Sequence, residues 1–161
     1  MSLSIRRARP DEAALVFSLV GELAEYEKLS HEVHASEADI AEALFGPNPR
    51  LYCDIAEWNG EPAGFAVWFV NFSSFAGRHG IYLEDLFVRP ALRGKGIGKA
   101  LLVHLAKQCL DNGWSRLQWA VLDWNAPSIA FYKSLGADLM DEWTICRVYG
   151  PALAALAEGA R

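Results

Sequence analysis

The sequence has few of the residues that metal centres and disulfide frameworks require. Its three cysteines, Cys53, Cys109 and Cys146, are odd in number and widely spaced, and neither a CxxC motif nor a cluster of histidines is present. This pattern supports neither a zinc site nor a disulfide frame, and it predicts buried thiols in a protein of a reducing compartment. We therefore expect no metal cofactor and a cytoplasmic location.

Long apolar runs and an excess of positive charge are also missing. No run approaches the roughly 18 apolar residues that a membrane-spanning helix needs. Arg6 and Arg7 precede the short apolar stretch 13–20, but Pro10 and two acidic residues separate them, so we expect no signal peptide. The net charge of −5 disfavours a nucleic-acid partner and suits small cationic or neutral substrates. We expect a soluble protein with neither a membrane nor a nucleic-acid partner.

The remaining composition is that of an ordinary globular domain. The chain has 161 residues, of which 52% are hydrophobic and 22% charged, and this balance argues against disorder. No internal repeat, low-complexity tract or linker interrupts it. We predict a single α/β domain over residues 1–161, with its core at about 3–150 and a tail, 151–161, that contains a small alanine-rich helix from Pro151 to Ala160.

Local patterns predict the order of the elements. Asn59-Gly60 is the strongest short hairpin signal, and the segment 71–80 is expected to be a loop between two strands. Strands are expected over Leu3–Arg7, Leu51–Trp58, Ala63–Val70, Tyr82–Val88, Leu117–Leu122 and Glu142–Tyr149, and helices after Pro10, from Ser36 to Gly46, over Lys99–Leu110 and from Asn125 to Gly136.

The segment 93–98, Arg-Gly-Lys-Gly-Ile-Gly, carries the most specific chemistry. It lies between a strand-like run, 81–88, and a helix-like run that begins at Lys99. A strand that ends in glycines before a helix directs several backbone N–H groups at one spot, and together with the positive end of the helix dipole they form an anion site, typically for phosphate. Where a dinucleotide fingerprint and a Walker loop require glycine, the chain has Lys99 and Arg93, so both sites are excluded. A glycine-rich turn without a ligand is the alternative.

Two motifs in this order resemble the GCN5-related N-acetyltransferase superfamily. The segment 93–98 fits its cofactor motif, Arg/Gln-x-x-Gly-x-Gly/Ala, and the run 125–136, Asn-x-Pro-Ser-x-x-Phe-Tyr-Lys-x-x-Gly, fits its second acetyl-CoA motif. The runs 23–27, 82–88 and 120–125 are similar to the diamine (spermidine/spermine) and thialysine N-acetyltransferases. The resemblance implies a mixed, mostly antiparallel central sheet flanked by helices, with strands splayed at the acetyl-CoA site. It also implies a homodimer.

The resemblance implies acetyl transfer from acetyl-CoA to a primary amine of a small cationic substrate, a diamine or a lysine-like amino acid such as thialysine. In polyamine acetylators the loop before the Glu-Asp strand carries an acidic residue, whereas the nearest positions here are Ser73 and Ser74. This departure disfavours spermidine and spermine, and the run 120–125 is more similar to the thialysine-type enzymes. The alternatives are acetylation of a protein lysine or N-terminus, and a CoA-binding module without turnover.

Two residues are expected to move protons. At pH 7 only about 0.1% of an amine with a pKa of about 10.4 is neutral, so a base is useful. The resemblance places Glu84 beside the amine, where it would act through water. Tyr132 is the expected general acid for the leaving thiol, because a phenol stays protonated at neutral pH. From the residues alone, Glu84 could instead be a surface glutamate and Tyr132 a core tyrosine.

The other candidates bind the two substrates. Backbone groups of Leu86 and Val88 are expected to meet the pantetheine arm as a peptide pairs with a sheet edge. Strand alternation predicts that Glu84 and Asp85 point to opposite faces. The candidate acceptor-binding residues are Tyr26, Glu27, Glu84, Asp85, Asp123 and Trp124. The candidate cofactor-binding residues are Leu86, Phe87, Val88, Arg93, Gly94, Lys95, Gly96, Ile97, Gly98, Lys99, Asn125, Pro127, Ser128, Phe131, Tyr132 and Lys133.

Overall fold

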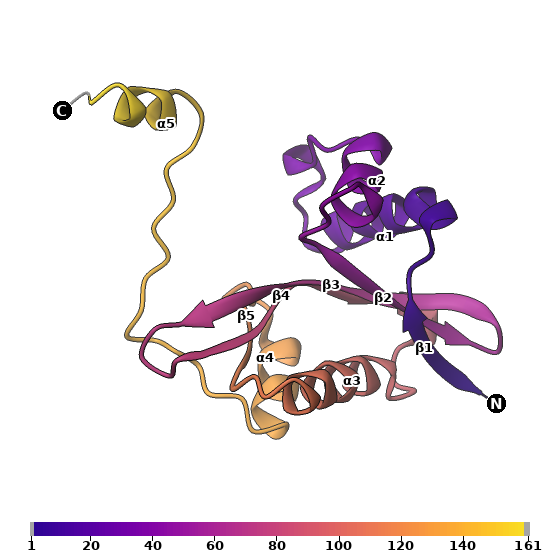
Figure 1. The fold of residues 1–161 in the computed structure, drawn as a ribbon. Helices are drawn as coiled ribbons and strands as arrows, with labels where there is room; N and C mark the ends of the chain where they lie inside the picture. Colours follow the sequence, from indigo (N-terminus) through magenta and orange to yellow (C-terminus); the bar gives the residue numbers. More distant parts are fainter. Residues whose placement is uncertain (1, 160–161) are drawn as a thin grey trace. The chain divides into compact units, whose positions relative to one another are not determined.

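The computed structural model describes residues 2–159, which Figure 1 shows as a ribbon. The chain divides into two units, Met1–Ala120 and Val121–Arg161, and each is described by itself. The first unit contains the strands β1 to β5 and the helices α1 to α3, and the second contains α4 (Ala126–Ser134) and α5 (Gly150–Ala157). None of the described helices is long and apolar enough to cross a bilayer.

One five-stranded sheet organises the first unit. Its strands lie in the order in which the chain forms them, and all neighbours are antiparallel except β4 and β5, which are parallel. The predicted mixed and mostly antiparallel sheet is therefore confirmed. The strands are β1 (Leu3–Arg7), β2 (Tyr52–Trp58), β3 (Glu61–Ser73), β4 (Arg78–Val88) and β5 (Leu117–Trp119).

Local sequence signals account for the turns and helix ends of this unit. Asn59 and Gly60 both have positive φ, 52° and 84°, as a tight hairpin turn of the I′ type requires. The Ser36 hydroxyl accepts the Asp39 amide N–H at 3.2 Å, and the Asp39 carboxylate accepts the Ser36 amide N–H at 2.8 Å, which caps α2. The helices are α1 (Ala13–Tyr26), α2 (Glu37–Phe45) and α3 (Ile97–Asp111).

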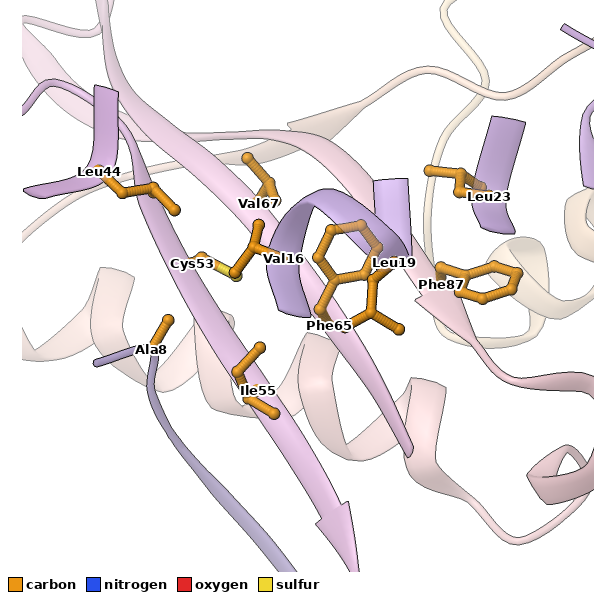
Figure 2. Close-up of a cluster of buried hydrophobic side chains, with 10 residues drawn as sticks. All are labelled: Ala8, Val16, Leu19, Leu23, Leu44, Cys53, Ile55, Phe65, Val67 and Phe87. Carbon is orange, nitrogen blue, oxygen red and sulfur yellow. The ribbon is translucent and has the colours of Figure 1, made fainter. Parts of the chain in front are cut away.

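The core lies between the sheet and the helices on its two faces. Figure 1 shows α1 and α2 on one face and α3 on the other. Figure 2 shows how Val16 and Leu19 of α1 meet Ile55, Phe65 and Val67 of the sheet, all of them buried. Phe87, close to the end of β4, belongs to the same cluster, so the core anchors the strand that leads to the glycine loop.

The end of β4 is fixed by a close backbone approach and by a bulge. A Cβ on Gly64 of β3 would lie 2.4 Å from the carbonyl oxygen of Phe87, so only glycine lets the two strands pack here. Val67 pairs with Asp85 and Trp68 with Leu83, which leaves Glu84 as an extra residue in β4. Such a bulge bends the strand and leaves the extra residue, here Glu84, outside the regular pairing of the ladder.

The expected loop over 71–80 is wrong for most of its length. β3 continues to Ser73 and β4 begins at Arg78, so only residues 74–77 form the turn. Cross-strand pairs extend the hairpin, and the rings of Phe72 and His79 lie 4.9 Å apart, edge to face. Such cross-strand pairs stabilise the hairpin, although the glycines and polar residues of the segment are typical of a loop.

Three expectations about the rest of the chain also need correction. β5 has three residues, not the six of 117–122, and within residues 2–159 the segment 142–149 belongs to no strand. Alternation of apolar and polar residues produces a strand only where a neighbour accepts its backbone hydrogen bonds, and no ladder includes 142–149. Cys146 of this segment is exposed, whereas Cys53 and Cys109 are buried as expected.

The helices of the second unit agree with the sequence. α4 follows Asn125, whose side-chain oxygen accepts the Ser128 amide N–H at 3.3 Å, and Gly136 follows its end with a φ of 90°. The tail helix is present as α5, and residue 160, at the end of its expected range, lies outside the described residues.

Candidate functional site

The carboxyl end of β4 has an open edge. β5 pairs with Ile81, Tyr82 and Leu83 of β4, and its last partner pair is Leu83 with Trp119. The pairing with β3 continues from Asp85 to Val88, but on the β5 side the described part of the chain supplies no strand for residues 84–88. Free N–H and C=O groups at such an edge can pair with an extended ligand. Leu86 and Val88, whose backbone groups are expected to contact the pantetheine arm, lie on this unpaired segment.

The loop after β4 collects backbone N–H groups. Gly94 and Gly96 have φ of 78° and 80°, which residues with a Cβ rarely adopt, and Gly96 caps α3. The first intrahelical bond runs from the Ala100 amide N–H to the Gly96 carbonyl at 3.0 Å. It leaves the N–H groups of Ile97, Gly98 and Lys99 without an acceptor in the helix. This arrangement fits an anion, because the helix dipole is positive at this end.

The two cations of the loop contact different aromatic side chains. The Lys95 Nζ lies 5.4 Å from the centre of the Trp58 ring, at the end of β2. The Arg93 guanidinium lies over Tyr26 at 4.4 Å and near Phe87 at 5.5 Å, and its Nε donates to the Val88 carbonyl at 2.9 Å. The Arg93 side chain is thus directed toward the ends of β4 and α1.

Three carboxyl groups lie near the β4 bulge. Glu84 is exposed, whereas Asp85 is partly buried and pairs across the ladder with Val67. Burial raises the pKa of Asp85 to about 7, and repulsion from the Glu84 and Glu27 carboxylates adds to the rise. Burial also raises the pKa of Glu27, which follows the last residue of α1. A cation would lower the free energy of this acidic cluster, which we define as Glu27, Glu84 and Asp85.

An aromatic ring lies beside the acidic cluster. Tyr26 is the last residue of α1, and its ring lies 6.5 Å from that of Phe87, at a tilt of 50°. The structure therefore brings four predicted acceptor residues, Tyr26, Glu27, Glu84 and Asp85, to the same end of the sheet as the predicted donor residues of β4 and the glycine loop.

The remaining candidates lie in the second unit, on α4 and just before it. The rings of Phe131 and Tyr132 are 5.5 Å apart, and Pro127 lies in the first turn of α4. The Asn125 cap fixes the start of the helix and with it the position of Ser128. Asp123 and Trp124 precede this cap, and Lys133 lies in the last turn of the helix.

Two supporting features were not predicted from the sequence. Arg89 donates two hydrogen bonds to the Glu22 carboxylate, at 3.0 and 3.2 Å, and a third to the Pro62 carbonyl at 3.0 Å. This ion pair ties the residue after β4 to α1, between partners 67 positions apart. The bulge at Glu84 is the second feature, and the adjacent Glu-Asp pair, unfavourable within a strand, is its one signal in the sequence.

Comparisons with known proteins agree on one family. The family model described as Acetyltransferase (GNAT) family matches residues 16–137. Thialysine N-epsilon-acetyltransferase of Sus scrofa is 39% identical, over 97% of this chain and 98% of that protein. L-ornithine N5-acetyltransferase of Arabidopsis thaliana is 30% identical, over 94% of this chain and 86% of that protein. An integron cassette protein from the mobile metagenome of V. cholerae has a similar solved structure, with a TM-score of 0.81 and 32% identity over 98% of this chain and 99% of that chain.

Proposed function

Because the chain belongs to the acetyltransferase (GNAT) family, and is thus an acetyl-CoA-dependent N-acetyltransferase, we propose that it acetylates the side-chain amine of a thialysine- or lysine-like amino acid or a short diamine. The observation that carries this proposal is the open edge of β4, with an N–H-rich loop after it and the acidic cluster beside it. Relatives named for thialysine and for L-ornithine, both matched over most of their length, support an amino acid with a side-chain amine.

The donor half of the proposal assigns acetyl-CoA to β4 and the loop. The backbone of Leu86 and Val88, on the edge that β5 leaves unpaired, would pair with the pantetheine arm, and the N–H groups of Ile97, Gly98 and Lys99 would bind the pyrophosphate. Asn125, Ser128 and Lys133 of the second acetyl-CoA motif are assigned to the same cosubstrate. The remaining cofactor-binding candidates, which lie in β4, in the glycine loop and in α4, are assigned to acetyl-CoA as well. The family resemblance supports these assignments.

The acceptor half assigns the cationic amine to the acidic cluster. The carboxylates of Glu27 and Asp85 would attract the ammonium group, and Tyr26 would provide an aromatic wall. Asp123 and Trp124 are proposed as further acceptor-binding residues. The hairpin 71–80 has no carboxylate and carries Arg78 instead, which disfavours a long polyamine.

The proposed reaction is direct attack. Glu84, exposed at the bulge, would take the amine proton through water, and the neutral nitrogen would then attack the thioester carbonyl carbon. As the bond between carbon and sulfur breaks, the Tyr132 hydroxyl would donate its proton to the departing thiolate. The nitrogen would release its second proton to solvent as the amide forms, and the Tyr132 oxygen would regain a proton from solvent. A base of this kind and an acid of this kind each contribute about 10²- to 10⁴-fold to a rate.

Three further parts of the proposal concern the whole protein. We propose that residues 1–161 act as a single domain, that two copies form a homodimer, and that the protein works in the cytoplasm without nucleic-acid or membrane partners. Size-exclusion chromatography with light scattering measures the number of copies directly. A monomer at micromolar concentration would contradict the dimer.

A substrate panel tests the acceptor. Lysine, thialysine, ornithine, putrescine, spermidine and a lysine-containing peptide are compared by kcat/KM, with CoA release as the readout. We expect thialysine, lysine or ornithine to be best. Spermidine as the best substrate would contradict the weight given to Ser73 and Ser74, and a preference for the peptide would favour a protein acetyltransferase. Tight acetyl-CoA binding without turnover on any amine would favour a non-catalytic module.

A further inference from the structure

The side chain of Arg93 joins the donor loop to the acceptor side of the site. Its backbone belongs to the loop, its Nε donates to the Val88 carbonyl at 2.9 Å, and its guanidinium lies 4.4 Å from the centre of the Tyr26 ring. Tyr26 ends α1 and is followed directly by Glu27 of the acidic cluster.

We propose that Arg93 is a positioning residue that couples acetyl-CoA binding at the loop to amine binding at the end of α1, by holding the Tyr26 ring. This inference rests on the proposed function. A planar guanidinium can stack on a ring and donate from Nε to Val88 at the same time, which fixes the orientation of both partners. The coupling is reciprocal, because two ligands that favour the same arrangement raise each other's affinity by one factor.

Replacing Arg93 by lysine distinguishes an effect of its positive charge from an effect of its contact with Tyr26. Arg93→Lys keeps the positive charge near the loop but loses the planar stack and the Nε donor. If the residue only attracts the pyrophosphate, this variant behaves as the wild type. If it positions Tyr26, the KM for the amine at saturating acetyl-CoA rises about two- to tenfold, the range that a cation–aromatic contact supports.

Lys95 provides the matched control. It is the other cation of the same loop, but its aromatic neighbour is Trp58, at the end of β2. Lys95→Met is expected to raise the KM for acetyl-CoA and leave the KM for the amine within twofold. An equal rise of the amine KM in Lys95→Met and Arg93→Lys would overturn the proposal, since the effect would then belong to loop charge in general.

A second pair of variants tests the same link from the acceptor side. Tyr26→Leu removes the ring and Tyr26→Phe keeps it. We expect Tyr26→Leu to weaken binding of CoA, measured by calorimetry, about two- to tenfold, and Tyr26→Phe to retain the wild-type affinity. We also expect Arg93→Lys to have no further effect on CoA affinity in the Tyr26→Leu background.

These measurements remain informative if one variant fails to fold or if no amine is turned over. CoA binding needs no acceptor, so a wild type without turnover contradicts the proposed function while the two Tyr26 variants still test the coupling. Equal CoA affinity in Tyr26→Leu and Tyr26→Phe overturns the inference. The inference is also overturned if Arg93→Lys and Tyr26→Leu each lower the CoA affinity and their effects multiply in the double variant.

Discussion

At the scale of single residues, burial changes the acid–base properties of Asp85. Its carboxyl group has a pKa raised to about 7, first by burial and then by Glu84 and Glu27. In an unfolded chain the pKa of Asp is about 3.9, so between about pH 4 and pH 7 the folded protein binds more protons than the unfolded one. Its contribution to stability therefore falls as the pH rises through this window.

Asp85→Asn should remove this pH dependence. We expect the free energy of unfolding of the variant to exceed that of the wild type by roughly 1–3 kcal/mol at pH 8, and the difference to shrink as the pH is lowered toward 4. Urea denaturation across this range measures it. Glu84→Gln, which changes the exposed neighbour, is the control and should show a smaller difference.

The same variant should change how the amine binds. In the wild type the KM for the cationic amine should fall as the pH rises through about 7, because Asp85 becomes charged there. In Asp85→Asn this fall should be absent. A pH profile of the amine KM that is identical in the two proteins would contradict the role proposed for Asp85.

Two glycines of the loop should respond differently to alanine. Gly96 has a φ of 80°, so Gly96→Ala should cost about 1–2 kcal/mol of stability through backbone strain. Gly98 has no such φ, and an added Cβ would lie 3.8 Å from the Val88 Cγ2, an ordinary contact. Gly98→Ala should therefore keep or slightly raise the stability, because alanine is the better helix former, and it should raise the KM for acetyl-CoA, since it adds a methyl group on the Val88 side. An unchanged KM would contradict the donor assignment.

At the scale of elements, the position of β4 decides the geometry of the site. The buried Phe87 and the Arg89–Glu22 ion pair hold its end against α1, while β5 leaves its other edge open after Leu83. The bulge at Glu84 and the close approach at Gly64 lie on the β3 side of the same segment. One edge of β4 is thus rigid and the other is available to a ligand.

Gly64→Ala tests this rigid edge. The new Cβ would lie 2.4 Å from the Phe87 carbonyl oxygen, so β4 must shift, at a cost of roughly 1–3 kcal/mol. We expect a lower melting temperature and a higher KM for acetyl-CoA. Gly21→Ala in α1 is the control, because nothing lies within 4 Å of its added Cβ, and it should stabilise the protein by about 0.5–1 kcal/mol.

At the scale of the whole molecule, the proposed base and the proposed acid belong to different units of the chain. Glu84 and the glycine loop belong to the first, and Tyr132 belongs to the second. Tyr132→Phe removes the proposed acid without changing the ring. We expect kcat to fall by about 10²- to 10⁴-fold, with the KM for the amine little changed. A Tyr132→Phe enzyme with wild-type kcat would contradict the role of Tyr132.

Patterns that depend on neighbouring residues were predictable, and pairings across the chain were less so. The Ser36 cap, the Asn59-Gly60 turn and the start of α4 each depend on a few adjacent residues, and all three are confirmed. The length of the β3–β4 hairpin, the shortness of β5 and the missing strand at 142–149 depend on partners distant in sequence. Periodicity cannot reveal whether such a partner is present.

The sequence by itself determined the family, the order of most elements and the positions of the glycine loop and the acidic pair, because motifs and turns are local. The tertiary structure decided which groups are buried and which lie together. It placed Asp85 near Glu27, with a pKa raised to about 7, left the β4 edge open, and turned the Arg93 side chain toward Tyr26. Burial, charge repulsion and stacking act between residues that only the folded chain brings into contact.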